Sequence, residues 1–354
     1  MNITTIGLDL AKNVFQVHGI DEYGRVVLQK QLTRAKVLVF FAKLAPCLIG
    51  MEACSGAHYW ARELMARGHT VRLMPAQYVK PYVKGNKNDG NDAAGICEAV
   101  TRSHMRFVSI NTPAQQDAHM LHRIRERLVA ARTALINQLR GLCGEYGVVF
   151  SVGPAAVQRG LVKVLGENAP GLSELALELL LELLLDLHQQ WQTLDERIAA
   201  YDARVVQACR GDDRSQRLDA IPGFGPLTAT ALVASVGNAT QFPNGRQMAA
   251  NLGLTPREHS SGGKQRLLGI SKRGDVYLRT LLIHGARTVL QHAAHKTDRL
   301  SRWVMAVQAR RGKNVAAVAL ANKLARIAWA VLARGRAYQA DWQERVTAPL
   351  AGGA

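Results

Sequence analysis

Apolar and polar residues alternate in short runs through the first 75 positions. This pattern predicts three strands, at residues 3–10, 14–20 and 25–32, with a turn over residues 21–24 between the last two. Two further apolar runs, at residues 47–51 and 69–74, predict a fourth and a fifth strand. Helical spacing over about 34–44 and 56–67 separates these strands, and another helix is expected to begin near Asp89 or Asn91.

Three consecutive strands followed by alternating helices and strands form the order of an RNase H-like domain. We therefore predict an α/β domain over residues 1–110, in which the first strand is central and the fourth strand lies beside it.

A different period governs the middle of the chain. Leucine and isoleucine recur at helical spacing over residues 113–146, and a second long helix is expected over 172–208. A segment containing glycine and proline joins them. The pattern favours an antiparallel coiled-coil arm within residues 111–210 that carries oligomer contacts, and the alternative is a compact helical bundle.

Composition adds charge to this picture. The 354-residue chain has a net charge of +18 and a pI of about 10.1. Between Arg214 and Ala354 there are 21 lysines and arginines but six acidic residues. A polyanionic partner is therefore expected, contacted mainly by the last two-fifths of the chain.

Cysteine usage and the most apolar stretch of the chain indicate the cellular compartment. The five cysteines have no zinc-binding spacing, and an odd number fits free thiols in a reducing environment. Residues 172–187 are rich in leucine, but Glu174, Glu178, Glu182 and Asp186 recur every four residues along them. A membrane span would not tolerate that acidic stripe, and no signal-peptide pattern precedes the first strand. We expect a cytoplasmic protein without a membrane partner.

Four carboxylates fall at the ends of predicted elements. Asp9 and Glu52 end apolar strand-like runs, while Asp89 and Asp92 lie three residues apart where a helix begins. Carboxylates beside apolar strand ends are costly unless a cation holds them, and Mg²⁺ is the usual cation beside substrate phosphates. Asp9 alone would be an ordinary turn or cap residue, but the four together predict a metal site.

Two glycine-containing motifs lie in the basic part of the chain. Pro222–Pro226 (PGFGP) separates two helical patterns, and Gly223 and Gly225 would allow a phosphate backbone to approach a helix N-terminus, as in a helix-hairpin-helix. A plain helical turn is the alternative. Further on, Ser260 and Ser261 precede two glycines in a loop, surrounded by basic residues at Lys264, Arg266, Lys272, Arg273 and Arg279. Spacing alone favours an ordinary Ser-Gly loop, because a serine needs a base or a metal to become a nucleophile.

Residues near the C-terminus have structural interpretations. The segment from about Asp298 to Tyr338 is expected to be helical and basic, with residues 308–314 as a phosphate contact. Trp303 and Trp329 are interpreted as core residues. The histidines, His122 among them, form no clear metal-ligand pattern and are interpreted as structural.

The motifs together resemble a known family. "GLDLAK", "GMEACSG" and "KNDGNDAAG", then "IPGFGPLTA" and "LGLTPREHSSGG…GISKRGD…LRTLL", are similar in order and spacing to the DEDD-type transposases of bacterial insertion sequences, the bridge-RNA-guided serine recombinases. The resemblance covers nearly the whole chain. It implies a domain like the Holliday-junction resolvase RuvC, a coiled-coil linker, and a transposase domain over residues 211–345.

The resemblance also implies roles for single residues. The acidic tetrad would be Asp9, Glu52, Asp89 and Asp92, holding Mg²⁺, two ions per site, and the nucleophile would be Ser261 in its Ser-Gly pair. Gly223, Gly225, Lys264, Arg266, Lys272 and Arg273 are the candidate nucleic-acid contacts. Family members form a composite site in a tetramer, a dimer of dimers, with the tetrad from one subunit and the serine from another.

The implied reaction is recombination between donor and target double-stranded DNA. A structured noncoding bridge RNA would pair with both DNAs, and a phosphoserine intermediate would carry the cut strand. One alternative is a metal-dependent junction-resolving nuclease that uses water as its nucleophile. Another is a non-catalytic nucleic-acid-binding protein.

Overall fold

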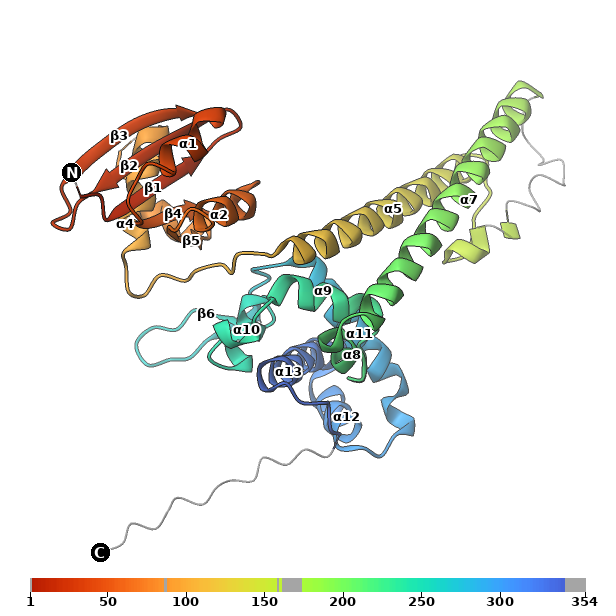
Figure 1. The fold of residues 1–354 in the computed structure, drawn as a ribbon. Helices are drawn as coiled ribbons and strands as arrows, with labels where there is room; N and C mark the ends of the chain where they lie inside the picture. Colours follow the sequence, from red (N-terminus) through yellow and green to blue (C-terminus); the bar gives the residue numbers. More distant parts are fainter. Residues whose placement is uncertain (1, 86–87, 158, 161–173, 341–354) are drawn as a thin grey trace, which may run out of the picture. The chain divides into compact units, whose positions relative to one another are not determined.

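The computed structural model describes residues 2–85, 88–157, 159–160 and 174–340. The chain divides into two compact units, Met1–Thr112 (unit 1) and Pro113–Ala354 (unit 2) (Figure 1). Parts of three predicted features lie outside the described residues: about half of the glycine- and proline-containing segment, the first two residues of the second arm helix, and positions 341–345 of the third domain.

Unit 1 is built on a five-stranded mixed sheet. The strands are β1 (Thr5–Leu10), β2 (Val14–Ile20), β3 (Val26–Thr33), β4 (Leu48–Glu52) and β5 (Thr70–Met74), in the spatial order β3-β2-β1-β4-β5. The first three strands pair antiparallel, and β4 and β5 run parallel to β1. The predicted RNase H-like order is confirmed, with β1 central and β4 beside it.

The helices of unit 1 differ in length from their predictions. They are η1 (Arg34–Lys36), α1 (Val37–Phe41), α2 (Ala57–Met65), α3 (Ala76–Val79), η2 (Lys80–Tyr82) and α4 (Asp89–Val100). The helix expected over 34–44 was too long, because a 3-10 turn precedes a single α-helical turn there. α4 begins as predicted, and the Asn88 side chain caps it by accepting a hydrogen bond from the Asn91 N–H.

The two faces of the sheet bury different partners. Ile6 and Leu8 of β1 belong to a core with α1 and α2, which includes Phe41 and Leu64. Gly7 lies between them in sequence, and a Cβ atom there would meet the backbone of α4. Because side chains alternate along a strand, β1 presents its even-numbered residues to α1 and α2 and its odd-numbered residues to α4.

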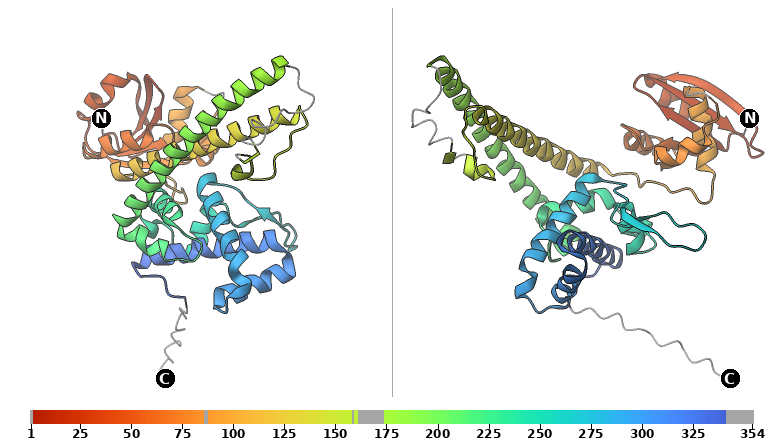
Figure 2. Two further views of the ribbon diagram at one scale, coloured as in Figure 1. Left: turned by 90° about the vertical axis from the view of Figure 1, so that its right-hand side faces the viewer. Right: turned by 180° about the vertical axis from the view of Figure 1, so that it is seen from behind.

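Unit 2 begins with two long helices that pack side by side and antiparallel. They are α5 (Pro113–Gly144) and α7 (Glu174–Arg210), and Figure 2 shows them in both views as the gold and green rods. Leu139, Leu184 and Trp191 belong to the apolar cluster between them. The expected lengths agree to within two residues at each described end.

Two ion pairs fix the register of these helices. Arg125 of α5 binds both carboxylate oxygens of Asp202 on α7, and Arg132 donates to Asp195 at 2.6 Å. From one pair to the next the chain advances seven residues on α5 and returns seven on α7. This is the repeat of an antiparallel heptad seam.

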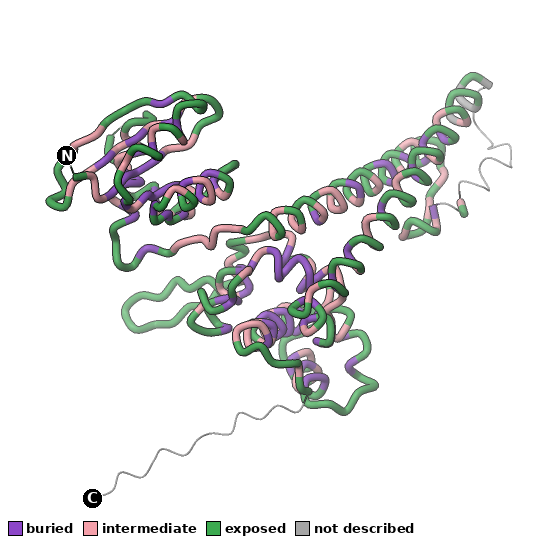
Figure 3. Tube along the Cα trace, in the orientation of Figure 1, coloured by how far each residue is buried: buried purple, intermediate pink, exposed green. Residues whose placement is uncertain are grey.

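The remaining elements of unit 2 form a helical body. They are α8 (Asp213–Asp219), α9 (Pro226–Val236), η3 (Ala239–Gln241), α10 (Gly245–Asn251), β6 (Pro256–Glu258), β7 (Leu267–Ile270), α11 (Val276–His292), η4 (Ala293–His295), α12 (Arg299–Arg311) and α13 (Lys313–Arg334). Its core gathers apolar residues of α9, α11, α12 and α13. Figure 3 shows α9 almost wholly buried, while the loop that follows β6 is exposed throughout.

The C-terminal segment is helical as expected, but it forms two helices. Gly312, with a φ of 81°, separates α12 from α13. α13 has the length and apolar composition of a membrane span. Leu320 and Leu324 are fully buried in the core of the helical body, together with Ala321, Ala325 and Ala328, so the structure gives this helix a core role.

Candidate functional site

Three of the four predicted acidic residues converge in unit 1. Carboxylate oxygens of Asp9, Asp89 and Asp92 lie within 4.8 Å of one another. Asp9 and Asp92 are half-buried and Asp89 is exposed. They come from the end of the central strand and from the first turn of α4, so two elements that are distant in sequence meet here.

Alternation along the strands explains this convergence. Asp9 is two residues beyond Gly7, so it lies on the face of β1 that α4 covers. The Gly7 site allows α4 to lie directly on the strand, because a Cβ there would stand 2.0 Å from the Ala93 carbonyl oxygen. The first turn of α4 therefore reaches the end of β1, and Asp89 and Asp92, three residues apart, share one face of that helix.

Glu52 lies on the same face but outside the three-carboxylate group. Gly50 pairs with Gly7 in the sheet and also faces α4, since a Cβ there would meet the Val100 side chain. Glu52 follows two residues later and ends β4 beside the end of β1. The strand register thus brings Glu52 to the same edge of the sheet, while its carboxylate is not among the oxygens within 4.8 Å.

Sequence reasoning missed Cys54 at this edge. Partial burial raises the pKa of the Cys54 thiol, and the negative charges of Glu52 and Asp9 raise it further. The closeness of this thiol to both carboxylates shows that Glu52 and Asp9 act on one shared region.

The donors present fit a hard divalent cation. The group of three supplies carboxylate oxygens, and no histidine nitrogen or cysteine sulfur belongs to it within the described residues. Oxygen-only ligation is typical of Mg²⁺, which binds through one or two carboxylates together with water and substrate phosphates. The arrangement can hold such an ion beside a phosphodiester.

The second candidate site is a hairpin in unit 2. β6 and β7 pair antiparallel and are joined by an exposed loop (Figure 1). Within the loop the Lys264 N–H donates to the Ser261 carbonyl at 3.0 Å, and Gly262 and Gly263 have φ values of 56° and 75°. Positive φ at both central positions defines a type I′ turn, which glycine adopts without strain. The loop expected here is therefore a hairpin with a defined turn.

The two serines have different surroundings. Ser260 Oγ donates to Glu258 Oε1 at 2.7 Å and accepts from the Arg266 N–H at 3.1 Å. The Ser261 hydroxyl makes no hydrogen bond within the part of the chain that the structure describes, and it is exposed at the first position of the turn. Ser260 holds the hairpin together, and Ser261 offers its oxygen to solvent.

The base of the hairpin is fixed by close backbone contacts. A Cβ at Gly253 would stand 2.1 Å from the Arg273 carbonyl oxygen, and one at Gly274 would stand 1.9 Å from the Asn251 carbonyl oxygen. Arg279 of α11 is 7% exposed and donates to the carbonyls of Leu252 and Arg273. Arg279, which the sequence placed among the basic residues around the serine loop, is instead buried, and it ties both ends of the hairpin segment to the helical body.

The predicted basic contacts occupy the same segment. Lys264 and Arg266 lie in the exposed loop, and Lys272 and Arg273 follow β7 with exposed side chains. Lys272 has a φ of 54°, which is uncommon for a residue with a side chain. These four cations and Arg257 of β6 surround the serine turn along the sequence, and between residues 256 and 273 the structure describes a single carboxylate, Glu258.

The PGFGP motif connects α8 to α9. Gly223, with a φ of 85°, is required for packing, because a Cβ there would stand 2.7 Å from the Gly285 carbonyl oxygen of α11. Gly225 has open space around it and caps the N-terminus of α9. The glycines thus have a structural role in a turn between helices, and phosphate contact at Gly223 and Gly225 stays a prediction.

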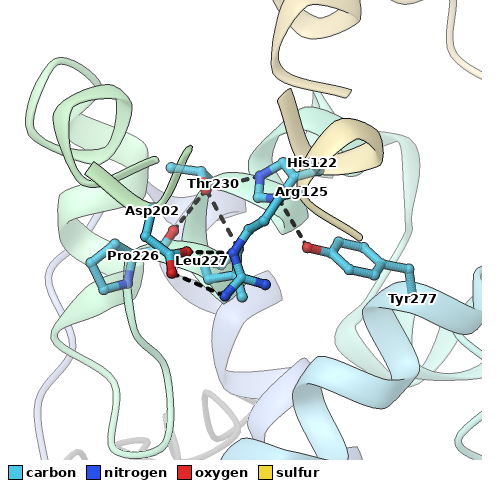
Figure 4. Close-up of polar contacts among 7 residues, drawn as sticks. All are labelled: His122, Arg125, Asp202, Pro226, Leu227, Thr230 and Tyr277. Atoms are coloured by element: carbon cyan, nitrogen blue, oxygen red, sulfur yellow. Dashed lines mark hydrogen bonds and ion pairs between the residues drawn. The ribbon is translucent and has the colours of Figure 1, made fainter. Parts of the chain in front are cut away.

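A buried polar cluster joins α5 to the helical body (Figure 4). His122 of α5 contacts the Tyr277 hydroxyl through Nδ1 and Thr230 Oγ1 through Nε2. Thr230 donates to the Pro226 carbonyl, so it accepts from Nε2–H, and Nδ1 accepts from Tyr277. Burial, then the nearby His119 and Arg125, lower the pKa of His122 to about 4, so the ring is neutral at pH 7. The structural interpretation of this histidine fits its contacts.

Known proteins resemble the chain along nearly its whole length. Residues 6–147 match a family model described as a transposase of the DEDD type, and residues 215–301 match one described as "Transposase IS116/IS110/IS902 family". A probable family 20 transposase of Pseudomonas aeruginosa is 53% identical over 96% of this chain and 99% of its own length. The transposase for insertion sequence element IS1111A of Coxiella burnetii is 47% identical over 96% and 92%. The transposase for IS1328 of Yersinia enterocolitica is 41% identical over 95% and 99%.

Proposed function

Because the chain belongs to the IS110/IS116/IS902 family of transposases, enzymes of insertion sequences that act on DNA, we propose that it cuts and exchanges DNA strands through a phosphoserine intermediate. In this proposal a structured bridge RNA pairs with donor and target DNA and selects the sites. The protein then needs contacts to backbone and shape more than to base edges.

Asp9, Asp89, Asp92 and Glu52 would hold Mg²⁺, two ions per site. The acidic group on β1 and α4 supports this assignment for three of them, and Glu52 would join from the adjacent strand end. A bound divalent cation neutralises charge on the phosphate oxygens at the cleavage point. The protein's own contribution would be to hold the carboxylates of two adjacent strand ends next to those of the first turn of α4.

Ser261 would be the nucleophile. Its oxygen bonds to the phosphorus while the bond from phosphorus to the adjoining nucleotide oxygen breaks. The serine proton leaves to solvent, and the departing oxygen takes up a proton. The new ester retains the energy of the phosphodiester, so attack by the hydroxyl of another strand rejoins DNA without ATP. Lys264, Arg266, Lys272 and Arg273 would offset charge on the phosphate during both steps.

One observation carries the serine mechanism. Of two adjacent serines, Ser260 is engaged in the hairpin, whereas Ser261 presents an exposed hydroxyl at the start of a glycine turn. An attacking hydroxyl must be able to approach the phosphorus. The exposed Ser261 can do so, whereas Ser260 would first have to give up its hydrogen bonds to Glu258 and Arg266.

The domain boundaries follow the same proposal. Residues 1–110 would be the catalytic DEDD domain, 111–210 the arm that joins subunits, and 211–345 the transposase domain with the helix-hairpin-helix and the serine. A dimer of dimers in the cytoplasm would combine the carboxylates of one subunit with the serine of another. The heptad register of α5 and α7 supports an arm that can carry such contacts.

The test is to trap the covalent intermediate. The full chain is incubated with labelled donor and target DNA, RNA transcribed from the flanking element, and Mg²⁺, and protein–DNA adducts are separated on a denaturing gel. We expect an adduct that maps to Ser261, that Ser261→Ala abolishes, and that Asp89→Asn abolishes.

Two outcomes would contradict the proposal. Cleavage by Ser261→Ala without any adduct in the wild-type protein would identify a hydrolytic nuclease. Unchanged strand exchange by Asp9→Ala would instead indicate a binding protein whose chemistry lies elsewhere.

A further inference from the structure

A large groove crosses the helical body of unit 2. It encloses about 1750 Å³ and is lined by α10, β7, α12, α13 and the residues that follow α13. Its floor is largely apolar and includes Ile270, Val318 and Ile327. The whole lining lies within unit 2, so the groove is a property of one compact body.

The groove carries five cations that no carboxylate of the described lining balances. Arg246, Arg299, Arg311, Lys323 and Arg326 are among the lining residues, and no aspartate or glutamate of the described residues is. None of these five makes a salt bridge with a carboxylate among the described residues. Like charges held this close repel one another, and an anion in the groove would relieve that repulsion.

Lys323 lies at the centre of this charge. Its ammonium is 4.2 Å from the centre of the Trp303 ring, which fixes the side chain across the groove between α13 and α12. Partial burial, followed by the charges of Arg299 and Arg326, lowers the pKa of Lys323. Arg326 is three residues further along α13, on the same side of the helix.

The shape of the lining indicates the form of the ligand. A small anion would need one cationic pocket, whereas these cations extend from α10 across α12 to α13. Apolar surface is also accessible, because Leu267 and Leu268 on the β7 wall are 56% and 39% exposed. A duplex hides its bases, but an unpaired strand can place phosphates on the cations and bases on the apolar floor.

The wall formed by β7 links the groove to the chemistry. β7 is the second strand of the hairpin whose turn carries Ser261. A strand lying along β7 therefore passes beside the segment that presents the proposed nucleophile.

From these observations we propose that the groove between α10, β7, α12 and α13 binds an unpaired nucleic-acid strand, with Arg299, Lys323 and Arg326 on its phosphates. The inference rests on the proposed function in that the family acts on DNA, and it is independent of the covalent step. Strand exchange exposes unpaired DNA near the cut, and the groove holds that strand until it is rejoined.

Fluorescence anisotropy tests this in EDTA, so that no metal-dependent cleavage interferes. The full chain is titrated against a fluorescein-labelled single strand of mixed sequence and against the matching duplex, over a range of NaCl concentrations. On a single strand, each phosphate contact adds about 0.7 to the steepness with which log affinity falls against log salt concentration. At 0.1 M salt this corresponds to a factor of about five in affinity for each contact. The double variant Lys323→Gln/Arg326→Gln should therefore bind the single strand about twentyfold more weakly, with a salt slope lower by about 1.4.

The matched control is Arg287→Gln. Arg287 is an exposed arginine on α11, a helix that contributes no residue to the groove lining, so the charge change per residue is the same. It should leave the single-strand affinity within about twofold, because an exposed charge outside the groove acts only through screened attraction. Lys323→Arg, which keeps the charge, should retain most of the affinity, and circular dichroism checks that each variant is folded.

Three results would overturn the inference. The first is wild-type affinity in the folded double variant, and the second is an equal loss in Arg287→Gln. The third is tighter binding of the duplex than of the single strand, with the same loss in the double variant. Ser261→Ala should bind the single strand normally. If the wild-type protein forms no adduct but the groove variants bind as described, the serine mechanism is wrong and the groove proposal is supported. If the adduct forms but the double variant binds the single strand normally, the groove proposal is wrong and the serine mechanism is supported.

Discussion

Gly7→Ala tests whether direct contact between β1 and α4 positions the acidic group. The added Cβ would stand 2.0 Å from the Ala93 carbonyl oxygen and 2.5 Å from the Cys97 nitrogen, both in the backbone of α4. Carbon and oxygen atoms in contact need more than 3 Å, so α4 must move by about 1 Å or more. Asp89 and Asp92 move with it, away from Asp9.

The expected effects differ for stability and for function. Overpacking of this kind destabilises a protein by about 1–3 kcal/mol. The core between the sheet, α1 and α2 is unchanged by the substitution, so we expect the variant to remain folded. A displacement of about 1 Å at a catalytic site lowers the rate by about 100-fold. We therefore expect a folded protein with weakened Mn²⁺ binding, measured by electron paramagnetic resonance, and with adduct formation reduced by about two orders of magnitude.

Gly19→Ala is the matched control in the same sheet. Its Cβ would stand 3.1 Å from the Leu28 Cβ and would meet only side chains. Adduct formation should then stay within a few-fold of the wild type. If Gly7→Ala binds Mn²⁺ and forms adduct as the wild type does, close packing of α4 on β1 does not set the geometry of the carboxylates.

Three further predictions concern unit 2. The folded-state pKa of His122 is about 4, below its ordinary value of 6.5, so the unfolded chain takes up the proton first as the pH falls, and stability decreases from pH 6.5 downward. The free energy of unfolding should fall by about 2 kcal/mol between neutral pH and pH 5, measured from urea unfolding midpoints. His122→Gln should remove this pH dependence, whereas the control His284→Gln, at an exposed histidine on α11, should retain it. Arg279→Met leaves two carbonyls without their donor and should make trypsin cleave the hairpin segment several-fold faster, and an unchanged cleavage rate would show that the clamp is dispensable. Ser260→Ala should lower adduct yield about fivefold, the equivalent of one hydrogen bond, whereas complete loss would make Ser260 the better candidate for the nucleophile.

The sheet of unit 1 could be predicted because its strands follow simple rules. The alternation in β2 and the turn after it predict a hairpin with β3. Three consecutive strands followed by alternating helices and strands are the order of an RNase H-like domain, which sets the expected order of strands in the sheet. The convergence of Asp9 with Asp89 and Asp92 could be anticipated for the same reason, since strand ends and a helix start fix their positions. The placement of Glu52 outside the closest group depends on side-chain geometry that a sequence pattern does not contain.

The hairpin strands of unit 2 gave no comparable signal. Residues 256–258 are all exposed, and β7 begins with two adjacent leucines, so neither strand alternates. Their pairing depends on Arg279 and on glycine contacts with residues distant in sequence. The groove was hidden from sequence reasoning in the same way, because Arg246 and Arg326 become neighbours only when α10 packs on α13.

The seven-residue step between the Arg125–Asp202 and Arg132–Asp195 pairs restricts how the two long helices can change in evolution. Losing one residue from either helix would turn everything beyond it by about 100° and take its leucines off the shared seam. Losing seven from both would shorten the pair by about 10 Å and keep every remaining partner matched. Natural variants of this protein should therefore differ in helix length by paired multiples of seven, a signature that can be sought by comparing gene lengths among insertion elements.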